Sequence, residues 1–261
     1  MPIFHEQITA KSRADGYFAV KAAAYRSGSM IYDQSTQENH DYRYKSPHVV
    51  SRDLVLPKGA PFTSRAQLWN AAANAENRRN SIEYREFEVA LPHELDEGQR
   101  KALVLEYAGW LRDRYKIACD VCVHRPTGRT DRRNHHAHIQ TTTRRVTAAG
   151  LGEKVRELDC AKKTGEGEII RAAWAEHVNR YLAWGGIDAR VDHRSLYRQG
   201  ITDRDPTMHL GPAATAIQRR GDQSARGAMN REIIATNAAV AAILAEEPAL
   251  VAAPFENVPS V

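Results

Sequence analysis

The sequence predicts an α+β protein in which helices flank a central, mostly antiparallel sheet of five strands, with a helical extension towards the carboxyl terminus. Two observations lead to this fold. Short segments of alternating hydrophobicity, such as 83–91, are interleaved with longer segments of helical periodicity, such as 96–115. In addition, the strand segments 121–124 and 135–144 are separated by a hairpin-length connection, which favours antiparallel pairing.

The first quarter of the chain predicts a strand and a short helix. Residues 2–9 alternate weakly and are expected to form a strand, and residues 10–16 form a polar turn. Residues 17–27 are rich in alanine, which favours a helix, and Gly28 is a suitable end for it. The next elements are a polar excursion or lid at 33–47 and a strand at 49–56 that stops before Pro57.

The middle of the chain predicts helix, strand and helix. A helix at 64–79 begins at a serine, a residue type that caps helix N-termini. Along the strand 83–91 the apolar side chains share one face, whereas Glu86 and Glu88 share the other. Asp96 then opens a long amphipathic helix that is expected to end near Tyr115.

The last third predicts helices and two domain boundaries. After the strand 135–144 we expect a polar stretch at 151–167, helices at 168–184, from Pro212 and at 223–247, and a loop at 191–210. The expected organisation is a core at 1–150, a helical extension of the same domain at 151–247, and a disordered tail at 248–261.

Composition limits the class of protein. The formal charge of +5 and the pI of about 9.1 suit a nucleic-acid partner. The amino terminus does not resemble a signal peptide, and no apolar stretch reaches the roughly 20 residues that span a bilayer. Three cysteines fit a reducing cytoplasm, and we expect Cys119 and Cys122 to be structural, with Cys122 the nearer to the histidine face described next.

Three histidines form the strongest site signal. His136 and His138 are two residues apart on one strand, so their side chains project to the same face. His124 ends the neighbouring strand and is expected to lie beside them, whereas His135 points to the other face. Three imidazoles on one face can bind a divalent metal ion, although a single His-X-His pair is more often an ordinary half-exposed strand.

Arginines surround this face, and this context favours the metal interpretation. Asp131 is the single acidic residue among them. So much positive charge beside a metal ion would be unfavourable unless a polyanion completes the site, which indicates phosphate as the missing ligand. The arginines in question are Arg125, Arg129, Arg132, Arg133, Arg144 and Arg145.

Four segments together carry a resemblance to a known family. They are the stretch from Ala22 to Gly28 after the first strand, Leu68–Ser81, Arg85–Pro92, and His124 with Asn134–Ile139; the later stretch 192–212 adds to them. In order and spacing they resemble the MobA/MobL (MobQ-type) conjugative relaxases, which belong to the His-hydrophobe-His endonucleases. The resemblance covers roughly residues 1–221. It implies that residues 1–150 are the catalytic core and that the helical extension 151–247 clamps DNA.

The resemblance implies roles for single residues. Tyr25 matches the nucleophile of the family, with Tyr32 as its main rival, and His124, His136 and His138 match the three metal ligands. Glu86 and Glu88 match an acidic pair, one of which helps to position or deprotonate the tyrosine; Glu88 is slightly preferred. The residues expected to contact DNA are Arg26, Arg125, Arg129, Arg132, Arg133 and Arg144.

The chemistry implied is transesterification. A tyrosine hydroxyl can attack a DNA phosphodiester, form a 5′-phosphotyrosine and later rejoin the strand. Three imidazoles favour manganese, zinc, cobalt or nickel, whereas the resemblance implies magnesium or manganese, so the metal stays open. The expected partners are single-stranded origin-of-transfer DNA, relaxosome accessory proteins and a type IV secretion coupling protein, in the bacterial cytoplasm and without membrane insertion.

Three other functions fit parts of the same pattern. A rolling-circle replication initiator or transposase would use the same site. A non-catalytic origin-binding accessory protein would bind DNA without forming a covalent adduct. A metal-dependent hydrolase would cleave DNA without a protein nucleophile.

Overall fold

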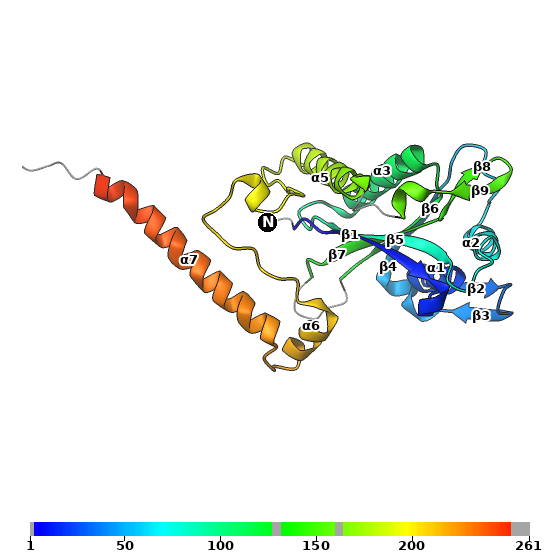
Figure 1. The fold of residues 1–261 in the computed structure, drawn as a ribbon, viewed down its shortest axis with the longest axis horizontal. Helices are drawn as coiled ribbons and strands as arrows, with labels where there is room; N and C mark the ends of the chain where they lie inside the picture. The colour runs from blue at the N-terminus through cyan, green and yellow to red at the C-terminus, as the bar shows by residue number, and fades with distance from the viewer. Residues whose placement is uncertain (1–2, 127–131, 160–163, 252–261) are drawn as a thin grey trace, which may run out of the picture. The chain divides into compact units, whose positions relative to one another are not determined.

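The computed structural model describes residues 3–126, 132–159 and 164–251, and the chain forms two compact units, Met1–His193 and Arg194–Val261. In the described part of the first unit, five strands form one antiparallel sheet in the order β1-β5-β7-β6-β4, which confirms the predicted α+β fold (Figure 1). The strands are β1 (Glu6–Ser12), β4 (Val49–Val55), β5 (Ile82–Leu91), β6 (Cys119–His124) and β7 (His135–Thr141).

Helices cover both faces of this sheet. The helices α3 (Glu97–Tyr115) and α5 (Glu166–Trp184) pack on one face, where the apolar side chains of β5, β6 and β7 are buried (Figure 1). The helices α1 (Ala19–Ser27) and α2 (Arg65–Asn74) pack on the other face, around a second buried cluster that includes Trp69 and Tyr84. The alternation along the strands therefore leaves every second side chain of β5, β6 and β7 on the α1 face, among them Glu86, Glu88, His124, His136 and His138.

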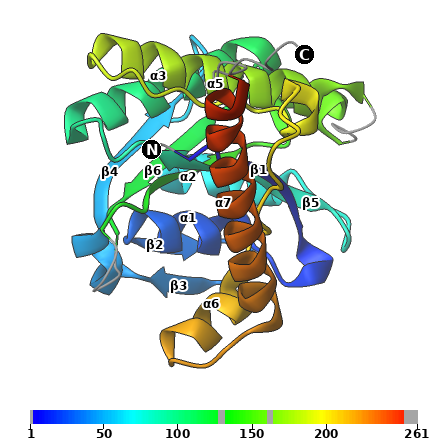
Figure 2. The same ribbon diagram turned by 90° about the vertical axis from the view of Figure 1, so that its left-hand side faces the viewer.

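Two hairpins and short turns complete the first unit. The hairpin of β2 (Met30–Asp33) and β3 (Glu38–Asp41) lies beyond α1, on the side away from α3 and α5 (Figure 2). The second hairpin is β8 (Arg144–Thr147) with β9 (Gly150–Lys154). The 3-10 turns are η1 (Arg13–Asp15), η2 (Arg43–His48) and η3 (Arg156–Leu158).

Several predicted boundaries were wrong, for identifiable reasons. The first strand begins at Glu6 and continues to Ser12, because the polar residues expected to turn still pair with the start of β5. The helix expected to reach residue 79 ends at Asn74, where the chain turns to bury the Glu76 carboxylate. The strand expected at 135–144 ends at Thr141, and Arg144 begins the separate hairpin β8–β9.

The first compact unit extends past residue 150, where the sequence predicted the core to end. Leu158 of η3 and Ile170 and Trp174 of α5 belong to the same buried cluster as the sheet. The polar stretch 151–167 contains most of β9, all of η3 and the start of α5, and residues 160–163 lie outside the described part.

The second unit consists of η4 (Tyr197–Gln199), α6 (Gly211–Arg219) and α7 (Ala225–Val251). Within it, the side chain of Asn230 on α7 pairs with both backbone groups of Met208, at 2.7 and 2.8 Å. The helix α7 continues past Pro248, and the rest of the predicted tail lies outside the described residues. No helix in the described ranges is both long and apolar enough to cross a membrane.

Candidate active site

The three predicted histidines meet on the α1 face of the sheet. His124 is the last residue of β6 and pairs in register with His136 of β7, and His138 follows two residues later on the same strand. The three ring centroids are 5.1 to 5.4 Å apart, and one ligand atom from each residue lies within 4.8 Å of the others. The alternation of the strand side chains thus assembles three donors of the kind that bind transition metals.

Each imidazole is held through one ring nitrogen by a protein oxygen. His124 donates from Nε2 to the backbone carbonyl of Arg26 (2.7 Å), and His136 donates from Nδ1 to the carbonyl of Asn134 (3.1 Å). Nδ1 of His138 lies 2.7 Å from a carboxylate oxygen of Glu86. A carbonyl only accepts, so the other nitrogen of a neutral ring keeps its lone pair. This is the outer arrangement that orients histidines towards a metal, and these residues therefore fit a divalent ion.

The surroundings of His124 and His136 also favour neutral imidazoles. Burial lowers the pKa of His124 to about 4; the Arg26 carbonyl opposes this shift, and the nearby His138 adds to it. Burial likewise lowers the pKa of His136. A ring without its second proton is the form that binds a metal ion.

Helix α1 is held by the sheet at its start and packs against η2 at its end. At its start, the backbone N–H of Ala19 donates to the buried carboxylate of Glu83 on β5 (2.7 Å), which replaces a side-chain cap. At its end, Gly28 adopts the left-handed conformation (φ 57°), and a Cβ there would lie 2.8 Å from the backbone nitrogen of Ser46. Glycine therefore allows η2 to pack directly against the end of α1.

Tyr25 lies in the last turn of α1 and is 44% exposed. Its ring and that of Tyr42 pack edge to face, with 5.2 Å between the ring centroids. The ammonium of Lys45 lies 3.2 Å from the centroid of the Tyr25 ring. Tyr25 also directly precedes Arg26, whose carbonyl holds His124. The hydroxyl-bearing ring is thus accessible, close to a cation and one residue from a direct contact with the histidine cluster.

Tyr32, the rival nucleophile, occupies a different place. It lies on β2, is 49% exposed, and its backbone carbonyl accepts from Asn70 of α2 at 2.9 Å. Asn70 also accepts from the backbone N–H of Gln34 at 2.8 Å. The side chain of Asn70, which belongs to the resembling segment Leu68–Ser81, therefore fixes the hairpin β2–β3 to α2.

The two glutamates differ in their contacts. Glu86 is buried between His138 and Arg26, and Nε of Arg26 donates to the same oxygen that His138 contacts. Burial would raise the pKa of Glu86, but these two partners outweigh burial and lower it to about 2. Glu88 is half-buried and pairs in register with His138; among the described residues its carboxylate has no hydrogen bond or ion pair.

Of the six predicted DNA contacts, the five that the structure describes fall into two groups. Arg26 and Arg144 face protein groups: Arg26 pairs with Glu86, and Arg144 pairs with Glu76 at 3.0 Å. The remaining residues of the prediction that the structure describes, Arg125, Arg132 and Arg133, are exposed. Arg129 lies outside the described residues.

His135, Cys119 and Cys122 lie on the faces of the strands that the sequence pattern predicted. His135 projects away from the cluster, near Arg100. Cys119 is buried with the α3 cluster, and Cys122 lies on the histidine face near Asp120.

Lys45 is the site residue that the sequence did not identify. It was included only as part of the polar excursion 33–47. The single clue is Gly28, because the approach of η2 that brings Lys45 over Tyr25 requires a residue without Cβ at that position.

Comparison with known proteins identifies relatives of this chain. The model of the MobA/MobL family matches residues 18–220. The mobilization protein MobL of Acidithiobacillus ferridurans is 39% identical, over 87% of this chain and 66% of its own length. Mobilization protein A of Escherichia coli is 32% identical, over 92% of this chain and 34% of its own length.

Longer relatives and a solved structure extend this similarity. The conjugal transfer protein TraA of Agrobacterium fabrum is 31% identical, over 85% of this chain and 22% of its own length. This chain therefore spans only part of each of these relatives. A structure solved to explain vancomycin resistance transfer in Staphylococcus aureus superposes with a TM-score of 0.64 and 28% identity, and covers 74% of this chain and 99% of that one.

Proposed function

Because this chain belongs to the MobA/MobL family, we propose that it is a conjugative relaxase, which nicks one strand of DNA at an origin of transfer through Tyr25. The observation that carries the proposal is the contact between His124 and the carbonyl of Arg26, since it joins the candidate metal ligands to the helix of the candidate nucleophile. The proposed partners remain origin DNA, relaxosome accessory proteins and a coupling protein, in the bacterial cytoplasm.

The reaction is an exchange of ester bonds. The Tyr25 oxygen attacks the scissile phosphorus and forms a phosphotyrosine with the 5′ end, while the 3′ oxygen leaves and takes up a proton. In the reverse direction the 3′ hydroxyl attacks the phosphotyrosine and restores the strand. A divalent ion bound by His124, His136 and His138 would offset negative charge developing on the phosphate.

Neighbouring residues have separate tasks in this proposal. Lys45, above the Tyr25 ring, would stabilise negative charge as the phenol loses its proton. Glu86 already accepts from Arg26 and contacts His138, so it would orient them rather than accept the proton. Glu88, which has no such partners among the described residues, is left as the carboxylate that can assist Tyr25.

Single-stranded DNA is the proposed substrate. An unpaired strand can carry its phosphates across the histidine face, and the exposed Arg125, Arg132 and Arg133 lie on the connection between the two histidine strands. Arginines and accessible aromatic rings are the groups that bind single strands without base pairing. The rings of Tyr25 and Tyr44, which are 44% and 73% exposed, supply such surfaces.

A covalent-adduct assay tests this function. Labelled single-stranded origin DNA from the replicon that encodes the chain is incubated with manganese, and the products are separated under denaturing conditions. Wild type and Tyr32→Phe should form a denaturation-resistant adduct, whereas Tyr25→Phe and a chelator should abolish it.

The other outcomes have equally definite meanings. Loss of the adduct in Tyr32→Phe alone would move the nucleophile to Tyr32. Cleavage without an adduct in any variant would favour a hydrolase, and binding without cleavage would favour an accessory protein.

A further inference from the structure

We propose that a second site, at the end of α2, binds a phosphate group. A cavity of about 670 Å³ lies between the chain following α2, the start of β5, the hairpin β8–β9 and η3. Its size is within the range of about 300 to 1,000 Å³ that is usual for small-ligand pockets. Five basic and three acidic residues line it: Arg78, Arg85, Arg144, Lys154 and Arg156, with Glu76, Glu153 and Asp159.

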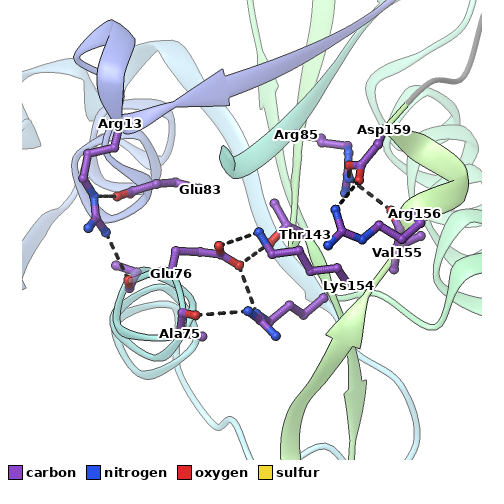
Figure 3. A network of polar contacts seen from close by, with 12 residues as sticks. Arg13, Ala75, Glu76, Glu83, Arg85, Thr143, Lys154, Val155, Arg156 and Asp159 are labelled. Atoms are coloured by element: carbon purple, nitrogen blue, oxygen red, sulfur yellow. Dashed lines mark hydrogen bonds and ion pairs between the residues drawn. The ribbon is translucent and has the colours of Figure 1, made fainter. Parts of the chain in front are cut away.

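One wall is built on Glu76. This carboxylate is 2% exposed and pairs with two cations, Lys154 at 2.6 Å and Arg144 at 3.0 Å. It also accepts from the hydroxyl of Thr143 at 3.2 Å (Figure 3). One buried negative charge therefore pairs with two positive charges, and this wall keeps a net charge of one positive unit.

The facing wall repeats the arrangement around Asp159. Its carboxylate pairs with Arg85 and, at 3.0 Å, with Arg156 (Figure 3). Arg85 is 1% exposed, and a second contact joins its Nη2 to the carbonyl of Val155 at 3.1 Å. Here too, one carboxylate forms ion pairs with two cations.

The guanidinium of Arg85 does not use all of its hydrogen-bond donors within the described part of the chain. Among the described residues, its Nε and Nη1 are buried and have no hydrogen-bond partner. Burial lowers the pKa of Arg85, and Asp159 only partly opposes this effect. A buried guanidinium with spare donors is costly, and an anion in the adjoining cavity would reduce that cost.

The charges select the ligand. Glu153 is 82% exposed and lies 3.4 Å from Arg145, which does not line the cavity. The formal charge of the lining residues is +2, which matches one phosphate monoester or two successive DNA phosphodiesters. Arginine-rich walls suit phosphate oxygens, because a guanidinium can donate two parallel hydrogen bonds.

This site is separate from the histidine cluster. Arg85 and Glu86 are consecutive on β5, so their side chains lie on opposite faces of the sheet. The lining residues of β5 are confined to its start, whereas His138 pairs with Glu88 further along the strand. The phosphate site thus does not depend on the metal centre or on Tyr25.

Phosphate binding by the whole chain tests the proposal. The midpoint of thermal unfolding is measured against the concentration of inorganic phosphate, at constant ionic strength, for wild type, Arg78→Gln and Arg156→Gln. Both substituted side chains are exposed, so folding is retained. Arg145→Gln is the matched control, because it removes one positive charge from the same region outside the cavity. We expect phosphate affinity to fall about tenfold in Arg78→Gln and Arg156→Gln, and to stay unchanged in Arg145→Gln.

A second measurement identifies the source of the phosphate. The affinity of each protein for oligo-dT is measured against salt concentration. If DNA phosphates occupy the cavity, the log–log salt slope should shrink by about 0.7 in Arg156→Gln and not in Arg145→Gln. If the slope is unchanged while phosphate affinity falls, the ligand is a free phosphate ester.

An equal response to phosphate in all four proteins would overturn the site, whatever the DNA slopes are. Neither measurement requires nicking, so a failure of the covalent-adduct assay would leave this result independent.

Discussion

Nε2 of His124 lies 2.7 Å from the backbone oxygen of Arg26, and this contact joins the strand of the first metal-binding candidate to the helix of Tyr25. The side chain of the same arginine reaches Glu86, which in turn contacts His138. Three strands, β5, β6 and β7, and the helix α1 therefore share a continuous set of polar contacts. Disturbance of any member should be transmitted to the others, and this can be measured.

The first prediction concerns metal affinity. His136→Ala removes one of three imidazole donors and should weaken Mn²⁺ binding strongly. The loss should exceed the roughly 10- to 100-fold that is typical when a residue hydrogen-bonded to a metal ligand is replaced. His135→Ala is the control, since the adjacent side chain lies on the opposite face. Isothermal titration with manganese measures both. Equal losses in the two variants would mean that the three histidines do not form the site.

The second prediction concerns the Arg26–Glu86 pair. Glu86→Gln leaves the guanidinium of Arg26 buried without its countercharge, since the side chain of Arg26 is only 13% exposed. We expect the free energy of unfolding in urea at pH 7 to fall by about 3 kcal/mol. Glu88→Gln, with no ion pair among the described residues, should cost less than about 1 kcal/mol. Similar values for both variants would show that the pair contributes little.

The third prediction is a pH dependence of stability that arises from Glu6. This carboxyl group on β1 is 5% exposed, and in the described structure its Oε1 has no hydrogen-bond partner. Burial raises the pKa of Glu6 from 4.5 to about 7, although Arg171 opposes the shift. The native state therefore prefers the protonated group more strongly than the unfolded state does.

Because of this preference, the contribution of Glu6 to stability decreases as the pH rises. Stability from protonated Glu6 is complete below pH 4.5 and is lost as the pH rises through 7. Relative to Glu6→Gln, the wild-type free energy of unfolding should fall on the order of 3 kcal/mol over that interval. Urea titrations at a series of pH values measure the difference, and a constant difference would contradict a raised pKa at Glu6.

The fourth prediction separates backbone strain from steric contact at Gly28. Both Gly28 and Gly16 have positive φ, 57° and 80°, so alanine at either position should cost about 1 to 2 kcal/mol. Only at Gly28 would the new Cβ meet other atoms, 2.8 and 2.9 Å from the backbone of Ser46. Gly28→Ala should therefore destabilise by at least about 1 kcal/mol more than Gly16→Ala in urea denaturation. Equal costs would mean that η2 moves away freely.

Local sequence patterns were sufficient for most elements and for the histidine cluster. Strand alternation placed His136 and His138 on one face and His135 on the other, because the side-chain period of a strand is two. Asp96 was correctly identified as a helix start, since it forms a capping box with Gln99. Such features depend on neighbours within a few residues.

Features that depend on distant partners were not predictable in this way. Ser12 is a polar residue that remains in a strand only because it pairs with Ile82. Glu76 was expected inside a helix, yet it leaves the helix to pair with Lys154 from a hairpin far along the chain. The position of Lys45 over Tyr25 likewise depends on how η2 packs, which no local pattern encodes.

The strand order β1-β5-β7-β6-β4 has a consequence for the nascent chain. The last of these strands to be synthesised, β7, lies in the middle of the sheet and separates β5 from β6. Until β7 has left the ribosome, β5 and β6 each expose an unpaired edge, and only one of three histidines is present. Unpaired edges are sites where another chain can add a strand. We therefore expect release of residues 135–141 to be the step of synthesis that protects this protein from aggregation.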